Sequence, residues 1–278
     1  MIVDSQVHLW KPESPDRPWP PGGAERVHLP YALTYDMLLP MMDEAGVDRV
    51  VIVPPSWEGD RIDYGLEAAA KYPDRFAVMG RIALDEPQAR SLIPGWLQQP
   101  GMLGIRVNFS NRQADWLKDG TADWFWPAAE TAGIPVMVMA PLWKRELGAI
   151  AQRHPNLKLI IDHMGVSMQF ARERKLAEAV EQTLTLAKYP NVHVKLSSAP
   201  SYSSEPYPFR DMYPLLRSLV ASFGPQRCFW GTDITQVFNR CTYRQRVTHF
   251  TQELDFLSAP DKEWIMGRAI NECLGWHT

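Results

Sequence analysis

Residues that can move protons or bind anions stand within or just after short apolar runs of this sequence. The carboxylate of Asp233 can act as a general base, and the imidazoles of His8 and His163 can donate or accept a proton. The ammonium of Lys195 and the guanidinium of Arg106 suit anionic groups of a ligand. These residue types favour a hydrolytic site that activates water and stabilises a developing negative charge.

Alternation within three of the runs directs polar side chains to one face of a strand. Successive side chains of a strand point to opposite faces, and apart from Ser5 the intervening residues of these runs are apolar. The polar faces comprise Asp4, Gln6 and His8; Arg106 and Asn108; and His193, Lys195 and Ser197. Polar groups that point into a protein interior need partners, so we expect these faces to meet one another or a ligand.

Several of these residues also have a purely structural interpretation. Asp4 can tie down the first strand, and His193 begins its strand, which predicts a structural place at the far end from the site. His163 can be a core histidine, and Asp233 can cap a helix. Lys195 is harder to explain structurally, because an inward ammonium needs a carboxylate or an anionic ligand.

Eight apolar runs that alternate with helical segments must position these residues. The predicted strands are 2–9, 49–54, 75–83, 102–109, 135–140, 157–164, 192–198 and 228–233. Predicted helices include 121–132, 143–153, 167–188, 209–223, 240–257 and 260–274. This alternation predicts parallel strands in one closed α/β fold, a (β/α)8 TIM barrel, with the site at the strand carboxyl ends. A doubly wound open sheet is the alternative, although no Gly-rich phosphate loop supports it.

Two Pro-rich and aromatic segments interrupt the repeat, at 10–34 and 199–208. Each follows a predicted strand, where barrel enzymes build the walls of the active site, and the alternative is an irregular surface excursion.

The composition predicts one barrel domain over residues 1–278, with 45% hydrophobic and 22% charged residues. A net charge of −3 argues against nucleic acid, and no apolar run is long enough to span a membrane. The sequence starts without a signal-like segment and has three cysteines without metal-type spacing, which predicts a cytoplasmic protein with reduced thiols. The sequence does not decide the oligomeric state and is compatible with a homo-oligomer.

Five motifs in order then resemble a known family. They are Asp4 to Trp10, Gly104 to Phe109, Asp162 to Gly165, Val194 to Ser197, and Trp230 to Asp233, and the stretch 264–275 resembles the family's closing helix. The chain resembles, over nearly its whole length, the amidohydrolase-related proteins that include 2-pyrone-4,6-dicarboxylate lactonase, sugar lactonases and galactarolactone isomerase.

The resemblance has two departures that concern metal binding. Metal-dependent members carry His-x-His on the first strand, where this chain has Gln6 and His8, and often a histidine after the fifth, where 136–140 has none. We therefore expect a metal-independent enzyme without a cofactor, as the resemblance implies for the pyrone lactonase and lactone isomerase branches. The alternative is one zinc or manganese ion held by His8, His163 and Asp233.

We accordingly expect hydrolysis of a lactone or similar small cyclic ester that carries a carboxylate. Asp233 would activate water, and His8, His163 and Lys195 would polarise the carbonyl. Predicted substrate-binding residues are Gln6, Ser56, Arg81, Arg106, Asn108 and Ser197. For Arg106 the alternative is an internal ion pair with Asp60 or Asp233. Alternative functions are a metal-dependent decarboxylase or metallohydrolase, a lactone isomerase, and a barrel that only binds an acidic metabolite.

Overall fold

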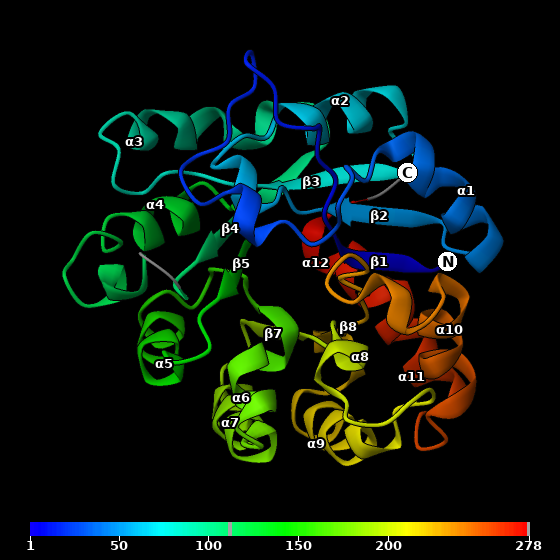
Figure 1. Cartoon of the computed structure of the whole chain (residues 1–278). Coiled ribbons are helices and arrows are strands. Elements are labelled where there is room, and N and C mark those ends of the chain that lie inside the picture. Colours follow the sequence, from blue (N-terminus) through cyan, green and yellow to red (C-terminus); the bar gives the residue numbers. More distant parts are fainter. Residues whose placement is uncertain (111–112, 277–278) are drawn as a thin grey trace.

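The computed structural model describes residues 1–110 and 113–276. Within them, eight parallel strands form one sheet in the order of the sequence, and Figure 1 looks onto the barrel that they form. The strands are β1 (Val3–Val7), β2 (Arg49–Ile52), β3 (Phe76–Gly80), β4 (Met102–Asn108), β5 (Val136–Met139), β6 (Leu159–Ile161), β7 (Val192–Lys195) and β8 (Cys228–Phe229). The predicted barrel is confirmed, and the open sheet is excluded.

Two backbone hydrogen bonds join β1 to the chain that follows β8 and so bring the ends of the sheet together. Ser5 N donates to Trp230 O at 3.2 Å, and Asp233 N donates to Gln6 O at 2.9 Å. The second bond holds Asp233, in the segment that follows the last strand, directly beside the first strand. The barrel closure therefore also positions Asp233 near His8, which directly follows β1.

Helices surround the barrel, as Figure 1 shows. They are α1 (Tyr35–Ala45), α2 (Asp63–Lys71), α3 (Ala89–Leu92), α4 (Phe125–Thr131), α5 (Lys144–Arg153), α6 (Met168–Arg172), α7 (Leu176–Leu184), α8 (Ala199–Tyr202), α9 (Tyr213–Phe223), α10 (Tyr243–Thr248), α11 (Ala259–Glu263) and α12 (Ala269–Leu274). None of the described helices is long and apolar enough to cross a membrane.

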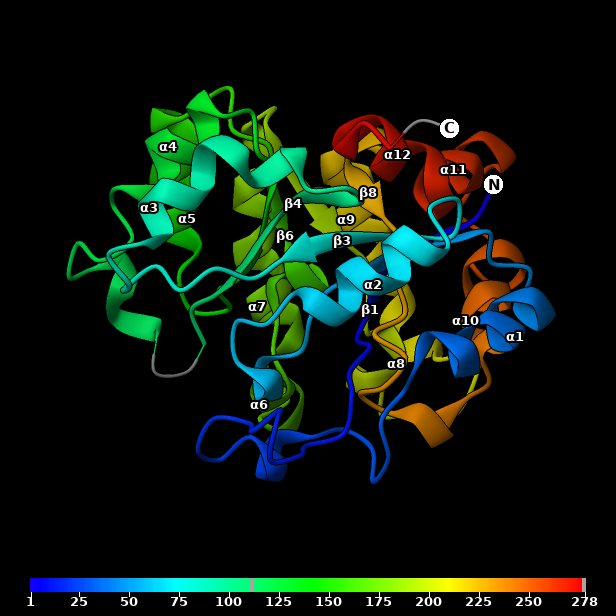
Figure 2. The same ribbon diagram turned by 90° about the horizontal axis from the view of Figure 1, so that it is seen from above.

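The two ends of the barrel are built differently. In Figure 2, α12 and both termini lie at one end, and the loop that follows β1 lies at the other, together with α8. Apolar residues of α12 pack in one cluster with residues of the strands, among them Val51, Met137 and Phe229. This apolar packing closes the amino-terminal end of the strands, so the polar strand ends lie at the opposite, loop-covered end.

Some predicted elements run too long. The strands near 157–164, 192–198 and 228–233 end early because His163, Ser198 and Asp233 have positive φ angles of 50°, 65° and 48°. The helix predicted at 167–188 is broken between α6 and α7, where Arg174 has φ 57°. Left-handed backbone interrupts both helix and strand, and although Ser and Asp are common turn residues, residue type alone did not distinguish these positions.

The first strand does not keep the single polar face that alternation predicts. The pairing of β1 with β2 shifts between Asp4 and Val7, so residues before and after the irregularity exchange faces. Asp4 accepts hydrogen bonds from the Thr232 backbone nitrogen at 2.8 Å and the Tyr243 hydroxyl at 2.8 Å. It ties β1 to the end of β8 and to α10, in agreement with its structural interpretation.

Candidate active site

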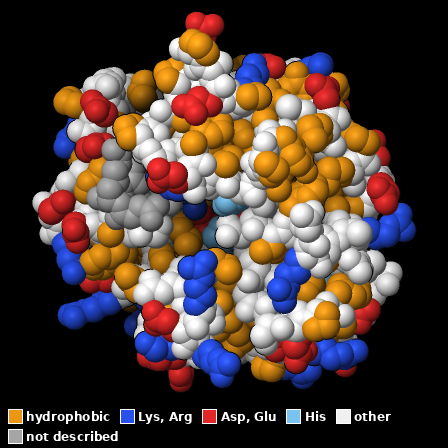
Figure 3. Space-filling view, viewed as in Figure 1, with side chains coloured by type: hydrophobic (Ala, Val, Ile, Leu, Met, Phe, Trp, Pro, Cys, Tyr) orange, Lys and Arg blue, Asp and Glu red, His pale blue; other side chains and the backbone are white. Residues whose placement is uncertain are grey.

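A cavity of about 340 Å³ opens at the carboxyl ends of the strands. It is visible near the middle of the face in Figure 3, with histidine atoms in its depth. The lining residues are His8, His28, Ser56, Trp57, Arg106, Asn108, Ser110, Met139, His163, Ser167, Met168, Tyr202, Asp233 and Gln236. Six of the predicted site residues, His8, Ser56, Arg106, Asn108, His163 and Asp233, are therefore brought to one cavity.

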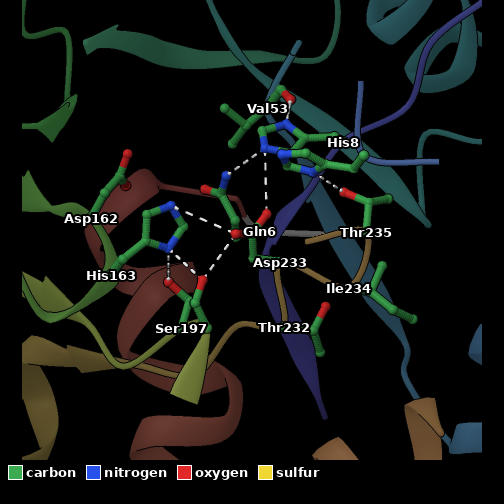
Figure 4. A network of polar contacts seen from close by, with 12 residues as sticks. Gln6, His8, Val53, Asp162, His163, Ser197, Thr232, Asp233, Ile234 and Thr235 are labelled. Carbon is green, nitrogen blue, oxygen red and sulfur yellow. Dashed lines mark hydrogen bonds and ion pairs between the residues drawn. The ribbon is translucent and has the colours of Figure 1, made fainter. Parts of the chain in front are cut away.

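Asp233 lies between two imidazole rings at the bottom of this cavity. His8 Nε2 is 3.4 Å from Asp233 Oδ1, and His163 Nε2 is 4.0 Å from Asp233 Oδ2, as Figure 4 shows. All three side chains are less than a tenth exposed. Asp233 Oδ1 is buried and has no hydrogen-bond partner among the described residues. This oxygen is therefore the free acceptor of the carboxylate.

Backbone contacts determine which nitrogen of His8 faces Asp233. His8 Nδ1 is 2.6 Å from the carbonyl oxygen of Val53, which can only accept a hydrogen bond, so Nδ1 carries the proton. Burial lowers the pKa of His8 to about 3, in spite of the neighbouring Asp233 carboxylate. The ring is then neutral near pH 7 and presents the lone pair of Nε2 toward Asp233.

His163 is held by two hydroxyl groups that follow β7. Its Nδ1 lies 2.8 Å from Ser197 Oγ and 2.8 Å from Ser198 Oγ. Burial also lowers the pKa of His163 below its ordinary value, against the opposing effects of Asp233 and Asp162. For Asp233, burial alone would raise the pKa, but the charge of His163, His8 or His28 lowers it whenever one of these rings is protonated, and the hydroxyl of Ser198 lowers it as well. Near neutral pH, the site thus contains an ionised carboxylate between neutral imidazoles.

A buried ion-pair network lies beneath the cavity. The fully buried Lys195 Nζ is 2.8 Å from Asp162 Oδ1, and Arg106 Nε is 3.0 Å from Asp162 Oδ2. The ammonium also donates to the side-chain oxygen of Gln6. Burial would raise the pKa of Asp162, but the cations Lys195 and Arg106 outweigh burial and hold it below the usual range. Asp162 therefore stays ionised between two cations.

The structure changes the expected roles of two residues. Gln6 and Lys195 are fully buried and are not among the residues that line the cavity, so neither reaches the substrate directly. The ammonium of Lys195 points into the barrel and requires a carboxylate partner, and Asp162 is that partner. The carboxylate immediately precedes His163 in the sequence, and that adjacency was the available signal for it.

The two predicted carboxylate-binding arginines differ in their access to the cavity. Arg106 lines it and pairs with Asp162, so the predicted alternative partners Asp60 and Asp233 are wrong. Arg81 instead lies 3.4 Å from Asp60 and donates to Gly59 O at 3.0 Å. It lines a small adjoining pocket, which it shares with Arg106, and burial together with that second cation lowers its pKa to about 10.

Smaller polar groups complete the walls. Asn108 Oδ1 accepts from the backbone nitrogen of Ser110 at 2.9 Å, so the amide nitrogen of Asn108 remains as a donor. Ser56 lines the cavity as predicted, whereas Ser197, predicted to bind substrate, is fully buried and does not line it, so it acts through His163. His193 stacks on Phe229 with ring centroids 5.4 Å apart and is not a lining residue, as expected for a structural residue.

Sequence reasoning missed several residues of the site, among them His28, Trp57, Ser198 and Tyr202. The segment 10–34 supplies His28, whose Nδ1 is 2.9 Å from Thr235 Oγ1 and whose ring lies 4.6 Å from that of Trp57. The segment 199–208 begins as α8 and supplies Tyr202 to the wall. Both irregular segments therefore build the active site, but no periodicity within them identifies which side chains point inward.

A divalent metal ion at this site would have to be held by His8, His163 and Asp233. Among the described residues, no group of three or more His, Cys, Asp and Glu side chains is arranged to hold one. Lys195 fixes the oxygen of Gln6, which leaves the amide nitrogen of Gln6 3.4 Å from His8 Nε2. An N–H donor thus faces the nitrogen that would have to coordinate the metal. This arrangement does not fit a zinc or manganese ion.

Comparison with known proteins agrees with this architecture. The model of the amidohydrolase family matches residues 3–274. An L-fucono-1,5-lactonase of Burkholderia ambifaria is 29% identical over 239 residues, which cover 83% of this chain and 79% of the relative. A 4-sulfomuconolactone hydrolase of Hydrogenophaga intermedia is 24% identical over 248 residues, which cover 83% and 73%.

Solved structures share the fold at low sequence identity. An amidohydrolase from Burkholderia multivorans with bound zinc has a TM-score of 0.82 and 21% identity, with 99% of both chains covered. A probable 2-pyrone-4,6-dicarboxylic acid hydrolase from Acinetobacter baumannii, with citric acid bound, has a TM-score of 0.80 and 20% identity, also with 99% of both chains covered. At these identities the similarity establishes the barrel fold.

Proposed function

Because this chain belongs to the amidohydrolase family and is a hydrolase, we propose that it opens the ring of a small lactone that carries a carboxylate, with Asp233 as general base. The proposal rests mainly on the surroundings of the Asp233 Oδ1 atom. This oxygen is buried and unpartnered within the described residues, and it belongs to a carboxylate whose pKa stays below its ordinary value in spite of burial. It is therefore an ionised acceptor ready to take a proton from water.

The proposed reaction needs one water molecule and returns every proton. The water oxygen attacks the carbonyl carbon of the lactone while one water hydrogen passes to Asp233 Oδ1. The carbonyl electrons form an oxyanion, which then collapses and breaks the bond from the carbonyl carbon to the ring oxygen. Asp233 gives its proton to that departing oxygen, so the product is the open hydroxy acid and the carboxylate is regenerated.

Hydrogen-bond polarity gives the histidines a different role from the one expected from the sequence. A neutral imidazole whose Nδ1 carries the proton cannot polarise a carbonyl through Nε2, because Nε2 then has only a lone pair. His8 is in this form because Val53 O accepts from its Nδ1. We therefore assign His163 to accepting a hydrogen bond from the water through Nε2, and His8 to the cavity wall, as a neutral residue whose Nε2 faces the amide of Gln6. Lys195 fixes Asp162 and Gln6 beneath them.

Donors on the opposite wall are suited to the negative charges of the substrate. Arg106 uses Nε for Asp162 and faces the cavity with the rest of its guanidinium, for whose Nη atoms the described residues provide no hydrogen bond. The amide nitrogen of Asn108, for which the described residues provide no acceptor, is a neutral donor on the same strand. We propose that Arg106 binds the substrate carboxylate in a bidentate manner and that Asn108 contributes to stabilising the oxyanion.

We further propose that the reaction is independent of a metal ion. The support is the amide of Gln6, which Lys195 orients so that it donates toward His8 Nε2. A lactone is also an activated ester, for which a Lewis acid is less necessary than for an amide. One structural relative contains zinc, so we compare turnover by the purified protein before and after treatment with a chelator. Loss of activity that added zinc restores would refute metal independence.

The test of the lactonase proposal is turnover of a panel of lactones by the wild type and by Asp233→Asn. We expect ring opening by the wild type, and a fall of at least about 100-fold in kcat for the variant, because a general base contributes on that order. Asp48→Asn, at the opposite end of the barrel, is the matched control. Incorporation of ¹⁸O from labelled water into the product identifies hydrolysis. A product without label would indicate isomerisation, and release of carbon dioxide would indicate decarboxylation.

A further inference from the structure

We propose that Ser198 is a positioning residue that aligns Asp233 and His163 for the nucleophilic water. The inference rests on the proposed function, because it assumes that Asp233 is the base. Ser198 follows β7 and precedes α8, is 1% exposed, and has φ 65° and ψ 13°. Residues with a Cβ atom rarely adopt this left-handed conformation. At an active site, such a conformation suggests that the side chain is needed where it lies.

The hydroxyl of Ser198 contacts both members of the catalytic pair. Its oxygen is 2.9 Å from Asp233 Oδ2 and 2.8 Å from His163 Nδ1. A serine hydroxyl has one proton to donate, and an ionised carboxylate can only accept, so that proton goes to Asp233. At His163 the same oxygen must then accept, which requires the proton of the neutral imidazole to be on Nδ1. One hydroxyl thus fixes both the carboxylate and the tautomer.

This arrangement leaves two acceptors for one water molecule. The bond from Ser198 holds Oδ2 of Asp233, and Oδ1 stays unpartnered within the described part of the chain. With its proton on Nδ1, His163 presents the lone pair of Nε2 to the cavity. A water molecule can donate one hydrogen to each of these acceptors and direct its own lone pair to the substrate. The amide of Gln6 already donates toward His8 Nε2, so His163 is the better second acceptor.

The left-handed turn explains why Ser198 can act in this way. Neighbouring residues of an extended strand point to opposite faces, so a strand through 192–198 would turn Ser198 away from Ser197. The strand instead ends at Lys195, and both hydroxyls reach the same nitrogen of His163. Figure 4 shows Ser197 beside the ring of His163. Only the Ser198 hydroxyl also bonds to Asp233, which makes Ser197 a closely matched comparison.

The experiment measures kcat, KM and thermal stability for Ser198→Ala, Ser198→Gly and Ser197→Ala on the lactone that the wild type turns over best. We expect both Ser198 variants to lose about tenfold to 100-fold in kcat with little change in KM, as for other residues that orient catalytic groups. Glycine suits a positive φ and alanine does not, so Ser198→Gly should melt at a higher temperature than Ser198→Ala. Equal losses of kcat in two variants of different stability separate positioning from folding.

A spectroscopic measurement tests the tautomer directly. In the wild type, the ¹⁵N chemical shifts of His163 should show a protonated Nδ1 and an unprotonated Nε2, and both Ser198 variants should show a mixture of the two tautomers. Ser197→Ala should keep the wild-type tautomer and lose clearly less kcat than the Ser198 variants. Ser201→Ala, a buried serine of α8 whose hydroxyl has no partner among the described residues, should keep wild-type kinetics.

Two outcomes distinguish failure of this inference from failure of the proposed function. If Ser198→Gly keeps kcat within about twofold of the wild type while Asp233→Asn is inactive, Ser198 does not position the base and the lactonase proposal stands. An Asp233→Asn variant with wild-type activity would instead remove the proposed general base, and with it the reason for this role of Ser198.

Discussion

Replacing Arg106 with lysine tests whether the enzyme recognises a carboxylate on its substrate. The guanidinium has separate groups for two anions, with Nε 3.0 Å from Asp162 Oδ2 and no hydrogen bond to the Nη atoms from the described residues. A lysine ammonium at the end of a similar stem can pair with Asp162 or with a substrate carboxylate, but it cannot form the planar fork. The variant therefore keeps the charge and loses the bidentate contact.

The expected loss follows from one charge-assisted hydrogen bond. Such a bond contributes about 1.5–3 kcal/mol, which corresponds to about a tenfold to 150-fold fall in kcat/KM. The assay compares two lactones of the same ring, one with a free carboxylate and one with its methyl ester. The fall should be confined to the acidic substrate, and Tm should change little, because lysine can still neutralise Asp162.

The reasoning would be refuted by equal losses on both substrates together with a lowered Tm. Arg106 would then be a structural partner of Asp162 alone. Arg106→Met serves as the reference for complete loss, since it removes the contacts to both Asp162 and the substrate. It should reduce stability as well as activity, because a buried carboxylate loses one of its two cations.

Three further predictions concern the buried groups and the metal. Lys195→Met should lower the free energy of unfolding by about 3 kcal/mol in urea titrations, since Asp162 keeps only Arg106; a change below about 0.5 kcal/mol would contradict this estimate. Burial lowers the pKa of His249 to about 4 in the folded protein, whereas its pKa in the unfolded chain is about 6.5. As the pH falls, the unfolded state therefore binds more protons than the folded state. Stability should therefore decrease by about 2 kcal/mol between about pH 7 and about pH 5 through this residue, and His249→Phe should lack that part of the decrease. Elemental analysis of the purified enzyme should find divalent metal well below one equivalent, and stoichiometric zinc with activity lost to a chelator would reverse the prediction of metal independence.

The order of elements and the location of the site could be predicted from the sequence because both depend on local patterns. Eight apolar runs between helical segments require parallel pairing with crossovers, and this repeat closes into a barrel. His8, Arg106, His163 and Asp233 stand within or at the ends of those runs, so the barrel necessarily brings them to one end. Residue type and position along the strand were sufficient for this part of the site.

The partners of these residues depended on tertiary structure. Asp162 pairs with both Lys195 and Arg106, which lie on different strands. Only their positions in the folded barrel show that one carboxylate neutralises both cations. The irregularity in β1 and the left-handed turn at Ser198 change which side chains point inward, and alternation alone cannot register either change.

The sequence by itself thus determined the fold class and which strand ends line the candidate site, because periodicity and residue type are local properties. Only the tertiary structure decided which groups donate and which accept. The proton positions of His8 and His163 are set by Val53 O and Ser198 Oγ, atoms contributed by other strands and turns. Which group donates depends on the partner that lies about 3 Å away in space, and the spacing of residues along the chain does not specify that partner.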